Sequence, residues 1–278
     1  MPDLHQLPTV LLYVPGDRPD RYAKAAAAAP AVILDLEDAV APAGKPEARR
    51  AVAEHLATTA DGARFWVRVG RATLEEDIAA LRDAPVFGGI VLADAVPATL
   101  ARLEQELPEI PVIGLVESAG ALSALDNMAA APNLVTFGIG EVDLLADLGI
   151  RRTAGTAHVI DMLRVSVVQA AAAAGLLPPV APTSLEVRST TTLASSTEHL
   201  RDLGFGSRTA VHPNQCSIVR AVFTPTAEEV ADAIDLLGRL ERAGGAVATD
   251  QNGRFIDAAV VRDARATLAR ASHEGDTP

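Results

Sequence analysis

The stretch A-V-I-L-D-L-E-D-A-V at residues 31–40 decides the fold and the position of the site. Residues 32–34 form a continuous apolar run, which is typical of a parallel strand covered on both faces. Asp35, Glu37 and Asp38 follow at its carboxyl end. Side chains alternate along a strand, so Asp35 and Glu37 are expected on one face and Asp38 on the other. Such a cluster of acids is costly to bury unless it meets a metal, an arginine or a substrate.

Short apolar runs alternate with longer amphipathic stretches along most of the chain, which indicates repeated βα units. We predict eight strands, at residues 9–13, 31–35, 64–69, 89–92, 111–116, 134–138, 180–187 and 209–211. Helices are expected between them, for instance at residues 45–56, 74–82, 98–106 and 158–174. This pattern favours a closed (β/α)8 TIM barrel. A doubly wound sheet is the alternative, but no G-x-G-x-x-G follows the first strand.

The pattern changes after the last strand. Thr226 begins a helix at residues 227–242, a hairpin is predicted at residues 246–256 around an Asn-Gly turn, and a final helix covers residues 257–271. We therefore divide the chain into a barrel domain (1–224) and a small extension (225–278). The extension is too short for a core of its own, so it is expected to pack on the barrel or on a neighbouring subunit.

Composition limits the classes of function and partner. The formal net charge is −12 and aromatic residues make up 3% of the chain, which argues against nucleic-acid binding. A single cysteine cannot form an internal disulfide and fits a reducing cytoplasm. No apolar run is long enough to span a bilayer, and the N-terminus does not have the order of a signal peptide. We expect a cytoplasmic enzyme without membrane partners.

Polar residues at the predicted strand ends converge on one mouth of the barrel, where such folds place their active sites. Glu117 and Asp143 follow neighbouring strands and are candidate Mg²⁺ ligands, since Mg²⁺ prefers oxygen ligands and keeps several waters. Either acid is also well placed to cap the helix that follows it. Glu141 is a rival to Asp143. No Cys/His spacing supports zinc.

Four other polar positions carry open alternatives. Arg68 lies within an apolar strand, where it can clamp a substrate oxygen, pair with Glu37, or do both. Arg18 and Arg21 in the first loop either meet phosphate or are solvated. Cys216 follows His212 closely enough for a nucleophilic pair, but a packing role for the thiol is the simpler interpretation.

Taken together, the motifs resemble the HpcH/HpaI aldolase and citrate lyase β-subunit family, the CitE-like proteins. The resemblance covers residues 9–271 and rests on the order and spacing of V-P-G-D-R-P-D-R, V-I-L-D-L-E-D-A-V, K-P-E-A-R, V-R-V-G, G-L-V-E-S-A, D-L-L-A-D-L-G and A-V-H-P-N-Q. It implies an Mg²⁺-dependent (β/α)8 lyase that makes or breaks a C–C bond in CoA or acyl-carrier thioesters. It also implies a homotrimer.

The resemblance implies a role for each matched residue. Glu117 and Asp143 would hold Mg²⁺, Arg68 would stabilise a thioester enolate, and Glu37 would orient Arg68. Asp257, in R-F-I-D-A-A, would act in acid/base catalysis, where the family's aspartate can reach a neighbouring subunit's site; the alternative is that it caps the last helix. Substrate and CoA binding would fall to Arg18, Arg68 and Arg208.

The chain departs from the family pattern at several positions. Where relatives read L-P-K after the fourth strand, this chain has Leu92-Ala93-Asp94, and V-R-I-N becomes V-R-V-G with Gly70. The metal segment G-x-E-D becomes G-E-V-D, and few acids remain at the seventh strand apart from Glu186. These departures affect the substrate more than the fold.

Three hypotheses follow for function. The first is cleavage of a 3-hydroxyacyl-CoA such as malyl-, citramalyl- or citryl-CoA. The second is a malate-synthase-like condensation or a thioesterase activity on the same thioesters. The third is a degenerate barrel that binds acyl thioesters without catalysis.

Overall fold

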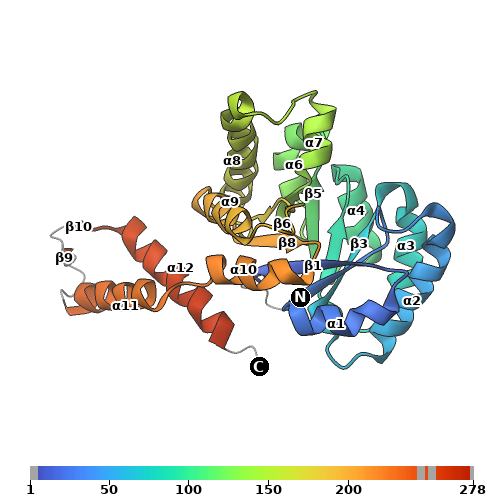
Figure 1. Ribbon diagram of the computed structural model, residues 1–278, viewed down its shortest axis with the longest axis horizontal. Helices are drawn as coiled ribbons and strands as arrows, with labels where there is room; N and C mark the ends of the chain where they lie inside the picture. The colour runs from blue at the N-terminus through green and yellow to red at the C-terminus, as the bar shows by residue number, and fades with distance from the viewer. Residues whose placement is uncertain (1–5, 243–247, 250–254, 276–278) are drawn as a thin grey trace. The chain divides into compact units, whose positions relative to one another are not determined.

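The computed structural model describes residues 6–242, 248–249 and 255–275. Eight parallel strands pair in sequence order, and β1 pairs with β8 to close the barrel. The closed sheet confirms the predicted TIM barrel and excludes the doubly wound alternative (Figure 1). The strands are β1 (Val10–Pro15), β2 (Ala31–Asp35), β3 (Phe65–Val69), β4 (Gly89–Leu92), β5 (Val112–Val116), β6 (Leu134–Ile139), β7 (Val180–Ala181) and β8 (Ser207–Ala210).

Helices follow the strands and cover the outside of the barrel (Figure 1). Two short helices follow β5 and one follows β6. The alternation of strands and helices predicted helices there but not their bounds, because a turn or two of helix leaves little periodicity in a sequence. Up to β8 the helices are α1 (Tyr22–Ala28), α2 (Lys45–Thr58), α3 (Leu74–Leu81), α4 (Pro97–Glu106), α5 (Ala119–Ser123), α6 (Leu125–Ala129), α7 (Glu141–Asp147), α8 (Ala157–Ala173) and α9 (Thr190–Asp202).

The seventh strand is much shorter than predicted. It covers only Val180–Ala181, not residues 180–187. Pro182 ends it because proline has no N–H for the ladder. The residues that follow form a loop instead, and this loop brings Thr183 and Leu185 to the mouth of the barrel.

The barrel interior is apolar at its centre and polar at its carboxyl end. Leu11, Ile33, Trp66 and Ile113, from four different strands, belong to one buried cluster. Further along, Asp35 is the register partner of Arg68 on the next strand. Partners in a parallel ladder point to the same side of the sheet, so register itself brings this acid and this base together.

The chain divides into two compact units, Met1–Arg220 and Ala221–Pro278, close to the boundary expected at residue 224. The helix α10 (Pro213–Phe223) crosses the division. In the second unit, α11 (Ala227–Arg242) begins with a capping box, in which the Thr226 Oγ1 accepts the Glu229 N–H at 3.1 Å and the Glu229 Oε2 accepts the Thr226 N–H at 2.7 Å.

The predicted hairpin and final helix are present in the second unit. The strands β9 (Ala248–Thr249) and β10 (Phe255–Ile256) pair antiparallel, while the predicted Asn-Gly turn lies outside the described residues. The helix α12 (Ala258–Gly275) runs further than the predicted end at residue 271.

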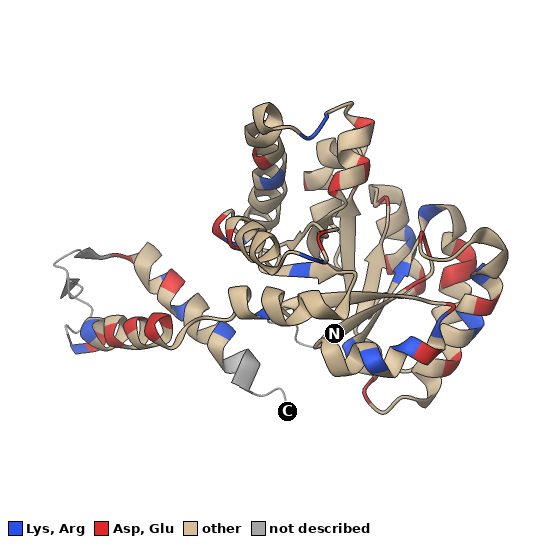
Figure 2. Cartoon of the chain, in the orientation of Figure 1, with Lys and Arg blue, Asp and Glu red and all other residues tan. Residues whose placement is uncertain are grey.

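Charged residues of both signs are interspersed on the outer helices, as Figure 2 shows for α2. On α2, Arg50 pairs with Glu47 at 2.6 Å and with Glu54 at 3.2 Å. Exposed pairs of this kind contribute little to stability, so they mainly keep the surface solvated. Within the described residues, no helix combines the length and the apolar character that a bilayer crossing requires.

Candidate active site

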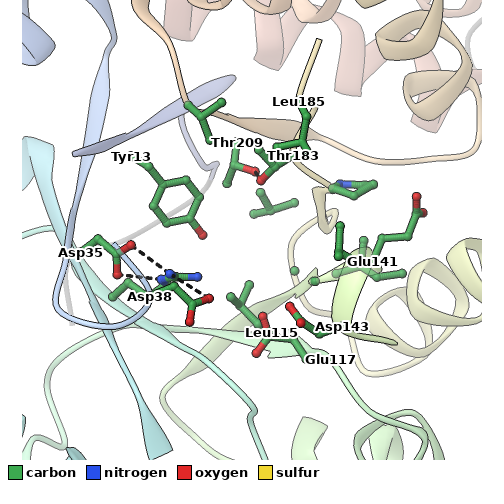
Figure 3. A pocket seen from close by; sticks show the side chains of 18 of the residues that line it. Tyr13, Asp35, Asp38, Leu115, Glu117, Glu141, Asp143, Thr183, Leu185 and Thr209 are labelled. Atoms are coloured by element: carbon green, nitrogen blue, oxygen red, sulfur yellow. Dashed lines mark hydrogen bonds and ion pairs between the residues drawn. The ribbon is translucent and has the colours of Figure 1, made fainter. Parts of the chain in front are cut away.

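A cavity of about 490 Å³ opens at the carboxyl ends of the barrel strands; we call it the barrel-mouth cavity (Figure 3). Its charged lining residues come from β2, β3, β5 and the segment after β6. They are Asp35, Asp38, Arg68, Glu117, Glu141, Asp143 and Arg152. Most of the charged residues predicted at the strand ends therefore meet in one cavity.

Arg68 is held mainly by Asp35. Its Nε and Nη2 donate to the two Asp35 carboxylate oxygens at 2.8 and 2.9 Å, and Nη2 also lies 3.0 Å from Glu37 Oε2 and 3.5 Å from Asp38 Oδ2. Burial has the largest single effect and works against the Arg68 charge, but the charge and hydrogen bond of Asp35, together with the charge of Glu37, outweigh it and the pKa of Arg68 is raised. The expected pairing with Glu37 is present, with Asp35 as the stronger partner.

Asp35 also fixes the loop that carries the other two acids. Its carboxylate accepts the backbone N–H of Glu37 at 2.8 Å and that of Ala39 at 3.3 Å. A buried carboxylate with two N–H donors and a bidentate arginine has little freedom to move. Asp35 is therefore a partner for both loop amides and an arginine.

Glu37 is only partly buried, and burial raises its pKa to about 6 against the opposing attraction of Arg68. Gly70 makes room for it, because a Cβ atom at position 70 would lie 2.8 Å from the Glu37 Cγ. The loss of a side chain at Gly70 is thus tied to the placement of Glu37.

Tyr13 is a site residue that sequence reasoning missed. The Cζ atom of Arg68 lies 5.2 Å from the centroid of its ring, within the range of a cation–π contact. Burial raises the pKa of the Tyr13 hydroxyl, which keeps it protonated. The available signal was strand alternation, since Leu11 and Tyr13 share one face of β1.

Glu117 and Asp143 form the second half of the site, and Figure 3 shows their carboxylates together. Burial raises the pKa of Glu117 to about 7, although the N–H of Asp94 donates to its Oε2 at 2.5 Å; the Asp143 charge raises it further. Neither acid caps a helix: the Ser118 Oγ caps α5, and α7 has no side-chain cap. The capping interpretation is therefore wrong for both.

Glu141, the alternative to Asp143 as a metal ligand, is bound by two arginines. Its carboxylate accepts hydrogen bonds from Arg164 Nε at 2.5 Å and Arg164 Nη2 at 2.8 Å, and a further bond from Arg152 Nη2. Two guanidinium groups satisfy this carboxylate. By contrast, no cationic side chain among the described residues forms an ion pair with Glu117 or Asp143, although the Arg68 charge attracts that of Glu117.

The donor set of Glu117 and Asp143 fits Mg²⁺. Across the described residues, no three His, Cys, Asp or Glu side chains converge in a metal-binding group. Two carboxylates without an arginine suit an ion that keeps several waters and takes substrate oxygens as its remaining ligands. The raised pKa of Glu117 shows that its charge is poorly compensated, and a divalent cation would compensate it.

The comparison with protein families shows to which family the chain belongs. Residues 9–213 match the model of the family described as HpcH/HpaI aldolase/citrate lyase. The chain belongs to this family. The match spans the strands that carry the cavity and confirms the resemblance inferred from the motifs.

Individual members of the HpcH/HpaI family align over almost the whole chain. The citrate lyase subunit beta-like protein of Mycobacterium tuberculosis (strain H37Rv) is 35% identical over 94% of both chains. The L-malyl-CoA/beta-methylmalyl-CoA lyase of Rhodobacter capsulatus is 30% identical, and the (3S)-malyl-CoA thioesterase of Cereibacter sphaeroides (strain KD131) is 33% identical; each alignment covers 94% of this chain and 93% of the relative.

The fold of a solved family member agrees with this structure. The crystal structure of CitE from Mycobacterium tuberculosis in complex with magnesium, acetoacetate and coenzyme A superposes with a TM-score of 0.82 at 32% identity. The superposition covers 97% of this chain and 100% of that chain.

Three residues of the first unit that the family resemblance singled out do not line the barrel-mouth cavity: Arg18, Glu37 and Arg208. Arg18 is paired with Asp20 at 2.8 Å in the first loop. Asp257 caps α12, its Oδ1 accepting the N–H groups of Ala259 and Val260, each at 2.9 Å. The capping role expected as an alternative for Asp257 is therefore present.

Arg208 is the third, and its expected place at the CoA site is corrected. The side chain is buried outside the cavity, where it donates to the Pro182 carbonyl at 3.0 Å, to Ser196 Oγ at 2.9 Å and to Thr197 Oγ1 at 2.6 Å. Its neighbour Thr209 lines the cavity, so strand alternation turns Arg208 the other way. Burial lowers the pKa of Arg208 to about 10.

His212 and Cys216 do not form a catalytic pair. The Cys216 Sγ lies 3.9 Å from the backbone carbonyl of His212, while the His212 Nδ1 accepts the Asn214 N–H at 3.2 Å. Burial raises the pKa of the Cys216 thiol to about 11. The thiol is thus un-ionised near neutral pH, and the packing interpretation is the one that fits.

Asp94, one of the departures from the family pattern, holds Glu117 through its backbone N–H. It has a φ of +46°, and its side chain pairs with Arg71 at 2.9 Å. This left-handed conformation is one that aspartate tolerates. Any residue except proline offers the same N–H, so what is particular to Asp94 is its side-chain pair with Arg71.

Proposed function

We propose that this protein is an Mg²⁺-dependent C–C lyase that cleaves a 3-hydroxyacyl-CoA thioester such as malyl-, citramalyl- or citryl-CoA. The observation that carries the proposal is the presence, in one cavity, of an arginine fixed by acids and a pair of acids without a cation. The lyases among the relatives and the magnesium and coenzyme A bound to a solved family member support it.

Glu117 and Asp143 would hold the Mg²⁺. When bound there, Mg²⁺ supplies Lewis-acid polarisation of the oxygens of the 2-oxo-acid half of the substrate. Asp94 keeps Glu117 in place through its N–H, and Glu141 is kept from competing by Arg152 and Arg164.

Arg68 would stabilise the enolate. Its bonds to the acids use Nε and Nη2, so Nη1 is left for an oxygen of a ligand. The 3-hydroxyl group loses its proton and becomes a carbonyl, the C2–C3 bond breaks, and the electron pair passes to the thioester as an enolate. A cation fixed before the reaction stabilises that developing charge without reorganisation.

The acid/base step is assigned to Asp257 as a proposal. A group must take the 3-hydroxyl proton, and an acid must return a proton to the enolate carbon. The Oδ1 atom of Asp257 caps α12, which leaves Oδ2 for proton transfer. Glu37, with a pKa of about 6, orients Arg68 together with Asp35.

The Glu117→Ala variant tests the lyase assignment. Purified wild type and variant are each incubated with malyl-, citramalyl- and citryl-CoA, with and without Mg²⁺, and the products are followed by mass spectrometry. We expect Mg²⁺-dependent cleavage by the wild type, and neither Mg²⁺ binding nor turnover by the variant. Asp126→Ala, an exposed acid outside the cavity, is the control. Undiminished turnover by Glu117→Ala would contradict the proposal.

A thioesterase or condensing activity is the second candidate, because a relative at 33% identity is a (3S)-malyl-CoA thioesterase. Hydrolysis of malyl-CoA to malate and free CoA, or release of free CoA from acetyl-CoA plus glyoxylate, would favour it over simple cleavage. Retained CoA binding without turnover of any ester would favour the non-catalytic thioester-binding hypothesis.

The cellular context is part of the same proposal. We propose a cytoplasmic homotrimer in which residues 1–224 form the catalytic domain and residues 225–278 pack on the barrel or on a neighbouring subunit. Arg18 is proposed to lie near the phosphates of CoA, or of the carrier that delivers the acyl group. Light scattering of the purified protein measures the subunit number.

A further inference from the structure

Arg152 is a second arginine in the barrel-mouth cavity, and the lyase proposal does not use it for substrate binding. It lies in the segment between α7 and α8, lines the cavity, and has a side chain that is 54% exposed. Its Nη2 donates to Glu141 Oε1. Glu141 is held independently by Arg164, so Arg152 is not required to neutralise it.

The ion pair with Glu141 uses only part of the Arg152 guanidinium. Arg152 donates to Glu141 through Nη2, and its Nε and Nη1 have no acceptor among the described residues. Glu141 itself is shared with Arg164, which also pairs with Asp161. The situation of Arg68 is the reverse, because one guanidinium meets three acids.

The order of the strands sets Arg152 and Arg68 on either side of the acid pair. Around the mouth, Arg68 comes from β3, Glu117 from the end of β5 and Asp143 from the helix after β6, and Arg152 follows in the same segment. In the proposed reaction the thioester oxygen lies at Arg68 and the 2-oxo-acid half lies at Glu117 and Asp143. A group that projects further from that half would reach the Arg152 side.

We propose that Arg152 binds a second carboxylate on the 2-oxo-acid half of the substrate, and so selects thioesters that release a dicarboxylic 2-oxo acid. The inference rests on the proposed lyase function and specifies its substrate class. An arginine with spare donors binds a carboxylate strongly, and its exposed position in the cavity allows a ligand to reach it.

Two thioesters form a matched pair for the test. Citryl-CoA and citramalyl-CoA differ in a single group, a carboxymethyl in place of a methyl, and release oxaloacetate and pyruvate respectively. The wild type should cleave citryl-CoA with the higher kcat/KM. In Arg152→Ala that preference should fall by about 10- to 100-fold, the range expected for loss of a hydrogen-bonded charge pair, with little change for citramalyl-CoA.

Two further variants serve as controls. Arg151→Ala removes the same charge from the adjacent residue, which does not line the cavity, and should keep the wild-type preference. Arg152→Lys should restore part of the preference. Because Arg164 still holds Glu141 in both Arg152 variants, their thermal unfolding should stay close to that of the wild type.

Binding measurements separate this inference from the lyase proposal. Calorimetric titration with oxaloacetate, pyruvate and CoA, each in the presence of Mg²⁺, should show that Arg152→Ala weakens oxaloacetate alone. An unchanged oxaloacetate affinity and ester preference would overturn the inference, and so would a loss confined to CoA, which would place Arg152 at the CoA phosphates. If the wild type cleaves no ester but binds oxaloacetate through Arg152, the lyase proposal fails and the carboxylate site stands.

Discussion

Asp35 and Arg68 are register partners on β2 and β3, and their side chains form a bidentate ion pair at 2.8 and 2.9 Å. The exposed fractions of the two side chains are 3% and 12%. The pair therefore lies where water screens it poorly, at the point where the apolar interior of the barrel gives way to the cavity. The pair belongs to both the fold and the site, because the same ion pair that links the ends of β2 and β3 also orients the Arg68 guanidinium.

Removal of Asp35 should affect both stability and activity. In Asp35→Ala, Arg68 loses its bidentate partner and two loop N–H groups lose their acceptor. The free energy of unfolding, measured by urea denaturation, should fall by about 3–5 kcal/mol, the range for a broken buried ion pair. Glu47→Ala, which removes an exposed partner of Arg50, should leave the urea midpoint unchanged. Equal midpoints for the two variants would contradict this account.

The pH dependence of kcat/KM should follow the ionisation of Glu37. Burial raises its pKa from 4.5 to about 6, so Glu37 is ionised above pH 6 and pairs with Arg68 there. Below pH 6 it becomes neutral and the pairing weakens. At pH 5 only about one tenth of the Glu37 carboxyls remain ionised, so kcat/KM at saturating Mg²⁺ should fall by up to about tenfold.

The linked effect on stability has the opposite direction. A carboxyl whose folded pKa is raised stabilises the protein below its unfolded value of 4.5, and that contribution is lost as the pH rises through 6.

Glu37→Gln should abolish the acidic limb of the kcat/KM profile, whereas Asp38→Asn, at an exposed acid, should retain it. If the acidic limb near pH 6 persists in Glu37→Gln, that limb reports the titration of another group.

Gly140 should be essential for the geometry of the acid pair. A Cβ atom at this position would overlap the Glu117 side chain, so Gly140→Ala should push the carboxylate away from Asp143. Mg²⁺ affinity, measured by calorimetry, should fall on the order of 10- to 100-fold, as it does when a metal ligand loses its orientation.

Gly155→Ala is the matched control for this substitution. The nearest atom to its new Cβ would be Thr153 Oγ1 at 3.7 Å, an ordinary contact, so Mg²⁺ affinity should not change. If Gly140→Ala bound Mg²⁺ with wild-type affinity, Glu117 would not be a metal ligand.

Local pattern was sufficient for the barrel and for most of the strand ends. The run at residues 32–34 and the alternation around it are properties of neighbouring residues, so they predict β2 and place Asp35 at its end. The same reasoning failed at β7, because prolines shorten a strand whose apolar composition alone looks longer. Tyr13 was overlooked because strand alternation places it on the inner face of β1 but does not distinguish a site tyrosine from a core tyrosine.

The sequence by itself determined the fold class, the family and the set of charged residues at the barrel mouth, because these depend on periodicity and on short motifs. Only the tertiary structure decided which charges pair. Glu141 is neutralised by Arg164, which lies 23 residues away, and Arg68 by Asp35, which lies 33 residues away. Ion pairing depends on distances of a few ångströms between strands and helices remote in the chain, and these distances exist only once the barrel has closed.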